Sequence, residues 1–240
     1  MRELIRIGQH SSEIFLAKCT NEKHSFYQKS SYSQDGIRNL RAELKGYEWY
    51  LDNAKLNESV EVSCDIDGYF KLTIPGFNAS PCNVKITISN CFNYAIRAID
   101  HYYNIWSSDI GSGHSPVHGD YSLEGNILFN QSNVYIIDWE HFQPNAAPIG
   151  FDILFMVFEL LKLDCKQSNP SKDQLRKIRE LIEYAGSINA VSNGYKDNYF
   201  IRYLEEQERI KDLWNGQYNK LPTNQFTTNQ LKILKVFFEG

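Results

Sequence analysis

The sequence has little that would direct it to a membrane or to an oxidising compartment. Its longest apolar run, 149–161, is interrupted by Asp152 and Glu159, so no transmembrane segment is predicted. The N-terminal "MRELIRIGQH" alternates charged and apolar residues and lacks a signal-peptide core. The five cysteines form no C-x-x-C pair and have neither disulfide-framework nor zinc-site spacing. We therefore expect a cytoplasmic protein with reduced thiols.

The sequence also lacks a strong charge of either sign. The net charge is -4 over 240 residues, and like charges do not gather in blocks. Without a basic field to attract phosphate backbones, nucleic acid is not expected as a partner, and any phosphate site has to be local. No internal repeat or low-complexity tract is present. The length is sufficient for one large domain or two smaller lobes.

The first third of the chain has the pattern of a small β-rich lobe with one helix. Short apolar runs between turn-forming residues predict strands, and apolar residues spaced three and four apart predict an amphipathic helix. The Pro- and Gly-rich stretch 73–81 ends this pattern, so we divide the chain into lobes 1–76 and 77–240. The expected elements are strands at 4–7, 14–19, 25–30, 60–64 and 69–74, and a helix at 36–51.

The rest of the chain is predicted to be mainly helical, which makes the fold class α+β. One helix is expected to begin after Ser171, because Ser171 and Gln174 have the spacing of a capping box. The expected elements are helices at 88–106, 150–163, 172–185, 195–214 and 228–239, and strands at 127–129 and 134–137.

An unusual concentration of polar side chains lies at 115–142, among apolar residues that are typical of strands. A buried carboxylate costs several kcal/mol unless a partner compensates it, so such a cluster usually has a function. Two carboxylates and one amide oxygen are hard donors that suit Mg²⁺, which binds few protein ligands and completes its shell with water and phosphates. The pattern therefore indicates phosphoryl transfer. The residues concerned are His118, Asp120, Asn126 and Asp138.

This stretch resembles the signature H-G-D, Asn, I-D-[WF]-E of the aminoglycoside phosphotransferase and choline kinase group, relatives of the protein kinases. The resemblance implies a protein-kinase-like fold, with a small antiparallel β lobe that carries one helix and a larger, mainly helical lobe. It also implies Mg²⁺-dependent transfer of the γ-phosphoryl group of ATP, or of GTP, to a hydroxyl of a small molecule or glycan. The matching residues are His118-Gly119-Asp120, Asn126-Ile127-Leu128 and Ile137-Asp138-Trp139-Glu140.

The resemblance assigns a role to each matched side chain. Asp120 would accept or orient the proton of the attacking hydroxyl. Asp138 would hold Mg²⁺ against the phosphates, and Asn126 would help to bind a second metal. His118 belongs to the same catalytic loop, where we expect it to hold the shape of the loop. Asp152 matches an Asp that stiffens this loop through hydrogen bonds, although it could equally be a helix N-terminal charge.

The spacing departs from the kinase pattern at one position. Asn126 follows Asp120 by six residues, whereas the pattern has five, and Gly125 occupies the expected place. Either a positive φ at Gly125 lets the loop bulge so that Asn126 still reaches the metal, or the second metal site is altered.

Lys29 and Glu43 are the residues we expect to serve the nucleotide phosphates. Lys29 ends a predicted strand and resembles the lysine that neutralises the α- and β-phosphates, whereas Lys18 is expected to be a solvent charge. Glu43 and Glu48 flank the apolar stripe of the helix at nearly equal angles, so periodicity does not choose between them. The resemblance selects Glu43 as the partner of Lys29.

Contacts to the rest of the nucleotide are assigned from position. The turn "GQHSSE" lies where the phosphate-covering turn would be and offers Gly8, Ser11 and Ser12, although it lacks G-x-G-x-x-G and could be a plain hairpin turn. The stretch "KLTIPGF" resembles the segment that holds adenine, which points to Ile74 and Phe77.

The acceptor is not identified by the sequence. The segment 198–218 offers aromatic and acidic residues that could hold an amino alcohol, an amino sugar or a saccharide, but helical spacing favours core or surface positions for most of them. A catalytically inactive, kinase-like nucleotide-binding module is the alternative to an enzyme, given the irregular spacing after Asp120. A binuclear metallophosphoesterase is disfavoured, because Asn126 is followed by Ile127 and no upstream D-x-H is found.

Overall fold

The computed structural model describes residues 2–7, 14–20, 25–64, 68–107, 113–196, 198–213 and 225–239. These residues form two compact units. Unit 1 contains the described residues up to Asn78 together with the short segment Asp138–Phe142. Unit 2 contains Ala79–Ile137 and the described residues from Gln143 onward. The change of unit after Asn78 falls close to the lobe boundary predicted after residue 76.

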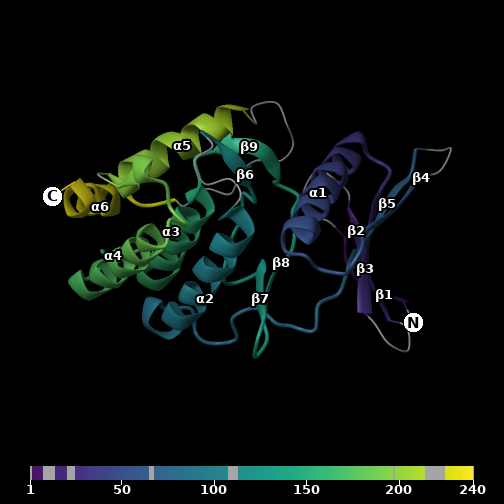
Figure 1. The fold of residues 1–240 in the computed structure, drawn as a ribbon, viewed down its shortest axis with the longest axis horizontal. Coiled ribbons are helices and arrows are strands. Elements are labelled where there is room, and N and C mark those ends of the chain that lie inside the picture. The colour runs from purple at the N-terminus through teal and green to yellow at the C-terminus, as the bar shows by residue number, and fades with distance from the viewer. Residues whose placement is uncertain are drawn as a thin grey trace. The chain divides into compact units, whose positions relative to one another are not determined.

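Unit 1 is built on a five-stranded antiparallel sheet in the order β1-β2-β3-β5-β4 (Figure 1). Its helix α1 lies between β3 and β4 in the chain and contacts β3 and β5. In the register of this sheet Lys29 of β3 pairs with Leu72 of β5, so the two side chains share one face. The elements are β1 Arg2–Ile7, β2 Phe15–Thr20, β3 Ser25–Ser31, α1 Gln34–Asn53, β4 Glu61–Cys64 and β5 Phe70–Pro75.

Helix α1 begins where Ser33 caps it, because the Ser33 hydroxyl accepts a hydrogen bond from the Gly36 amide at 3.1 Å. The centre of its predicted apolar stripe is buried, since Leu40 and Tyr47 have no exposed surface and Leu51 is nearly covered, whereas Ile37 and Leu44 are half-buried. This stripe fixes which side of α1 faces the interior of unit 1, and Glu43 lies on that side as well.

Unit 2 is mainly helical, with α3 at its centre. Most residues of α3 are buried, and α3 contacts α2, α4 and α5 (Figure 1). Its all-round apolar sequence is typical of a central helix. The elements are α2 Ile88–Trp106, β6 Ser115–Val117, β7 Ile127–Phe129, β8 Val134–Ile136, β9 Gln143–Ala147, α3 Phe151–Cys165, α4 Lys172–Ser187, the 3₁₀ turn η2 Asn193–Tyr195, α5 Tyr199–Leu213 and α6 Thr228–Glu239.

The predicted α+β fold class is confirmed, as is the capping box of α4, in which Ser171 and Gln174 each bond the other's amide. The predicted start of α5 at 195 is wrong, because residues Asn193–Tyr195 form a separate 3₁₀ turn capped by Ser192. The antiparallel pair of β6 and β9 was not predicted. Among the described residues, no helix is long and apolar enough to cross a bilayer.

Candidate functional site

Lys29 is the centre of a buried charge cluster in unit 1. Its ammonium group bonds Glu43 Oε1 at 2.7 Å and also forms an ion pair with Asp138 Oδ1. The side chains of Lys29 and Glu43 are 10% and 1% exposed, whereas that of Asp138 is 30% exposed. Glu48, the alternative partner, lies on the exposed side of α1. Three residues from a strand, a helix and the I-D-W-E segment are therefore brought together.

Acidic groups outnumber basic groups in this cluster, because one ammonium group faces several carboxylates. Burial acts to lower the pKa of Lys29, but Asp138, Glu43 and Glu140 more than offset it and hold this pKa well above its ordinary value. Burial raises the pKa of Glu43 to about 7, against the opposing effect of Lys29. Lys29 thus stays charged at neutral pH, and the excess of carboxylate oxygens is suited to a hard cation.

The backbone at Asp138 is held in an unusual conformation. Asp138 has φ 64°, in the left-handed region that few non-glycine residues adopt. Its amide donates a long hydrogen bond of 3.4 Å to the hydroxyl of Tyr47 on α1. The next residue, Trp139, is fully buried, with ring centroids 5.2 Å from Tyr50 and 5.8 Å from Phe142. Packing against α1 therefore compensates a backbone strain of about 1–3 kcal/mol.

Gly46 is the residue that sequence reasoning missed at this contact. A Cβ atom at Gly46 would lie 2.5 Å from Trp139 Cβ and 3.0 Å from Phe142 Cβ. Only glycine leaves room for the segment Asp138–Phe142 to lie this close to α1. The available signal was a glycine in the middle of a helix, where it costs about 1 kcal/mol relative to alanine.

Gly46→Ala is expected to destabilise the chain. Alanine is favoured over glycine in a helix by about 1 kcal/mol. The steric overlap is expected to cost more than this gain, because the clashing atoms are attached directly to the backbone and overpacking costs about 1–3 kcal/mol. Urea denaturation measures the loss. Gly186→Ala in α4 is the matched control, because its Cβ would meet only Tyr199 Oη at 3.5 Å. Equal stability changes for the two variants would contradict the close contact with Trp139.

In unit 2, His118 fixes the start of the loop that carries Asp120. His118 Nδ1 accepts from the Asp120 amide at 3.1 Å, so Nε2 carries the proton that it donates to the Ile137 carbonyl at 2.9 Å. The His118 side chain has no exposed surface. With both ring nitrogens engaged, His118 has the position of a residue that holds the loop, whereas Asp120 is half-buried.

Asp152 holds the same loop from the first turn of α3. Its two carboxylate oxygens accept from the amides of His118 and Gly119 at 2.9 and 3.0 Å. Burial raises its pKa to about 7, and the two amide hydrogen bonds act in the opposite direction. The residue is thus both a first-turn carboxylate and the loop support that the resemblance implies.

The raised pKa of Asp152 predicts a dependence of stability on pH. A carboxyl group whose pKa rises from 3.8 to about 7 on folding favours the folded state below pH 4, and this contribution is lost as the pH rises through 7. The unfolding free energy of the wild type relative to Asp152→Asn is therefore expected to fall between about pH 4 and 7 and then level off. Urea denaturation across this range measures it. A difference that rises with pH would contradict the assignment.

The extra residue between Asp120 and Asn126 is accommodated in a turn. The Ser122 carbonyl accepts from the amides of Asn126 and Ile127 at 3.1 and 3.0 Å, and the Asn126 side-chain nitrogen donates to the Asp120 carbonyl at 2.9 Å. The explanation through a positive φ at Gly125 is wrong, because Gly125 does not adopt one. Asn126 nevertheless folds back to Asp120 despite the longer spacing.

Glu159 is a second residue that the sequence did not single out. It lies within the apolar α3, and burial together with the charges of Asp120 and Glu124 raises its pKa to about 8. A half-buried carboxyl group thus lies within electrostatic reach of the candidate base. Its only signal was an acidic residue in an otherwise apolar helix.

Of the other residues predicted to contact the nucleotide, two lie in the described part of the chain and three do not. Gly8, Ser11 and Ser12 lie outside the described residues. Ile74 points to the buried face of β5, and Phe77 is half-buried after that strand. Among the described residues no group of three or more His, Cys, Asp or Glu side chains is arranged around a metal position. A magnesium site with one or two protein ligands does not require such a group.

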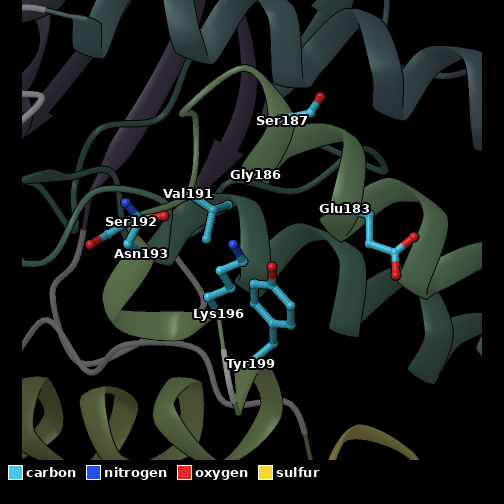
Figure 2. Close-up of a pocket in the computed structure, with 8 residues that line it drawn as sticks. All are labelled: Glu183, Gly186, Ser187, Val191, Ser192, Asn193, Lys196 and Tyr199. Carbon is cyan, nitrogen blue, oxygen red and sulfur yellow. The ribbon is translucent and has the colours of Figure 1, made fainter.

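The acceptor candidates on α5 are mostly committed to other contacts. Tyr203 is in the core, and Glu205 and Glu206 pair with arginines of the same helix. Tyr199 lines a pocket of about 270 Å³ together with Glu183 and other residues of α4 and η2 (Figure 2). The exposed polar residues around it make this pocket a surface depression. Trp214 and Tyr218 lie outside the described residues.

No protein-family model and no curated protein matches the chain. Among solved structures, spectinomycin phosphotransferase APH(9)-Ia in complex with ADP and spectinomycin is 14% identical, with TM-score 0.43 and coverage of 99% of this chain and 88% of that one. Choline kinase LicA from Streptococcus pneumoniae is 13% identical, with TM-score 0.47 and coverage of 99% and 93%. Aminoglycoside phosphotransferase APH(4)-Ia is 11% identical, with TM-score 0.44 and coverage of 99% and 92%. The α+β fold class is thus observed in the elements of the chain itself, and members of the group that its motifs resemble are among its structural matches.

Proposed function

We propose that the chain transfers the γ-phosphoryl group of ATP, or of GTP, to a hydroxyl group of a small molecule or sugar, with Mg²⁺. The observation that carries this proposal is the ion pairing of Lys29 with both Glu43 and Asp138. These residues were assigned to phosphate and metal binding from three separate parts of the sequence. A lysine held by a helix glutamate and beside a metal-binding aspartate is the arrangement that phosphoryl transfer needs.

The residues of the Lys29 cluster have the chemistry to bind a nucleotide phosphate. Lys29 would contribute the fixed positive charge, with Glu43 orienting its ammonium group. Asp138 would hold the metal, since its carboxylate is hard and partly exposed, and Asn126 would supply an amide oxygen. Mg²⁺, when bound, would neutralise charge on the phosphates.

Asp120 would act as the general base toward the acceptor hydroxyl. Its loop is held by His118, Asp152 and the Asn126 side chain, so the backbone that carries Asp120 is held in place before any substrate binds. Such preorganisation is important in phosphoryl transfer, where positioning and electrostatics supply most of the catalysis.

The carboxylates near Asp120 favour a cationic acceptor. Asp120 and Glu124 are both close enough to Glu159 to interact with it electrostatically within unit 2. Because its pKa of about 8 leaves Glu159 largely protonated at neutral pH, a cationic amino alcohol or amino sugar would favour its ionised form and gain an ion pair, whereas a neutral sugar would not. A cytoplasmic location is part of the same proposal, because all five cysteines are free thiols.

Nucleotide consumption with a panel of acceptors tests the proposal. The purified chain is incubated with ATP or GTP and Mg²⁺, together with amino alcohols, amino sugars or neutral sugars. Acceptor-dependent release of ADP or GDP, abolished by a chelator, is the expected result. Tight ATP binding without turnover on any acceptor would instead support the inactive binding module.

A further inference from the structure

Two cysteines of unit 2 lie side by side although they are nine positions apart in the chain. The Sγ atoms of Cys82 and Cys91 are 3.7 Å apart, and both residues are buried. Cys82 precedes α2, and Cys91 is in its first turn, where the Cys91 amide bonds the Thr87 carbonyl. Because an S–S bond is about 2.05 Å long, the two sulfur atoms have to approach by only about 1.7 Å to become bonded.

The segment that carries Cys82 is hydrogen-bonded to the loop that carries Asp120. Ser80 and Phe129 exchange two backbone hydrogen bonds of 3.0 and 2.7 Å. The Cys82 amide donates to the Leu123 carbonyl at 3.4 Å, which is a long and weak bond. A displacement of Cys82 toward α2 therefore acts on Leu123 in the middle of the loop.

We propose that Cys82 and Cys91 are a redox modification site, at which a peroxide forms an intramolecular disulfide that alters the Asp120 loop. In the first step a Cys82 sulfur attacks hydrogen peroxide, so that an S–O bond forms, the O–O bond breaks and water leaves. In the second step Cys91 attacks the sulfenic sulfur, so that the S–S bond forms and a second water leaves. Two thiols are oxidised and one peroxide is reduced to two waters.

The environment determines the order and speed of these steps. Cys82 is 8% exposed and Cys91 has no exposed surface, so Cys82 meets the oxidant first. Burial raises the pKa of Cys91 to about 11, although the hydrogen bond with the Thr87 backbone acts in the opposite direction. Since the thiolate is the nucleophile, the disulfide forms slowly at neutral pH and faster in alkaline solution.

Mass spectrometry of the full chain after treatment with hydrogen peroxide tests the covalent part. The Cys64→Ser background is used, because Cys64 is exposed and could link two chains. The expected product has lost two hydrogens and yields one peptide pair joined through Cys82 and Cys91, and dithiothreitol reverses it. Cys91→Ala abolishes the product, whereas Cys165→Ser leaves it unchanged. Higher oxidation of single cysteines without the joined pair would overturn the proposal.

Amide hydrogen exchange of the same samples tests the effect on the loop. Oxidation is expected to change exchange at Cys82, Asn126 and Ile127 by several-fold, and reduction restores it. Unchanged exchange in the oxidised chain would contradict the coupling. Neither readout depends on phosphoryl transfer, so the site can be present in a chain that proves to be inactive.

Discussion

Replacing Asp120 by Asn is expected to lower turnover by about 10²–10⁴-fold and to leave nucleotide affinity close to that of the wild type. The carboxylate is needed to accept the proton of the acceptor hydroxyl, and an amide does not accept it at neutral pH. The backbone contacts of Asp120 with His118 and Asn126 do not involve the carboxylate, so the loop keeps its conformation in the variant.

The Asp120→Asn measurement needs a control for the loss of one negative charge. Asp173→Asn serves, because Asp173 is an exposed residue of α4 that pairs with Arg176. Its kcat is expected to stay within assay error of the wild type. Wild-type kcat in Asp120→Asn would refute the assigned base, while a large rise in KM for ATP with unchanged kcat would move Asp120 to nucleotide binding.

Lys29→Met is expected both to abolish nucleotide binding and to lower the unfolding free energy by about 3–5 kcal/mol. Removing the ammonium leaves the Glu43 carboxylate buried without its partner, and Glu43 Oε2 already lacks a hydrogen-bond partner among the residues that the structure describes. Burial then raises the pKa of Glu43 further. A carboxyl group with a raised pKa in the folded state favours folding only while it is protonated. The destabilisation is therefore expected to be larger at pH 8, where Glu43 ionises, than at pH 5.

A double variant separates the two effects of Lys29. Lys29→Met with Glu43→Leu removes the uncompensated carboxylate, so its stability is expected to recover toward the wild type while nucleotide binding stays lost. Lys18→Met on the neighbouring strand β2 is the matched control, with little effect on either property. Denaturation and calorimetric titration with ATP and Mg²⁺ measure both. Nucleotide affinity that recovers in the double variant would show that Lys29 has only a structural role.

The chemistry of the cluster was predictable from sequence, whereas the packing that positions it was not. Lys29, Glu43 and Asp138 carry functional groups whose types and order can be read along the chain. Gly46 and Tyr47 act through close approach to the Asp138–Phe142 segment, a contact between residues about 90 positions apart that no local pattern encodes. Helix periodicity indicated only that Tyr47 is buried.

The long regular elements were predictable and the short ones were not. Helix α2 was predicted with its observed bounds, because its apolar residues recur with a clear helical period. Strand β9 reads "QPNAA", residues of low β propensity that pair with β6 only through tertiary structure. The turn after Asp120 was attributed to a glycine conformation, but hydrogen bonds to the Ser122 carbonyl form it instead.

The most direct test of the proposed phosphotransferase is a crystal structure of the chain with a non-hydrolysable ATP analogue and Mg²⁺. The proposal predicts a metal bound to the carboxylate of Asp138 and the side-chain oxygen of Asn126, with the nucleotide phosphates at the Lys29 ammonium. Phosphates bound elsewhere, or a metal that contacts neither residue, would contradict it.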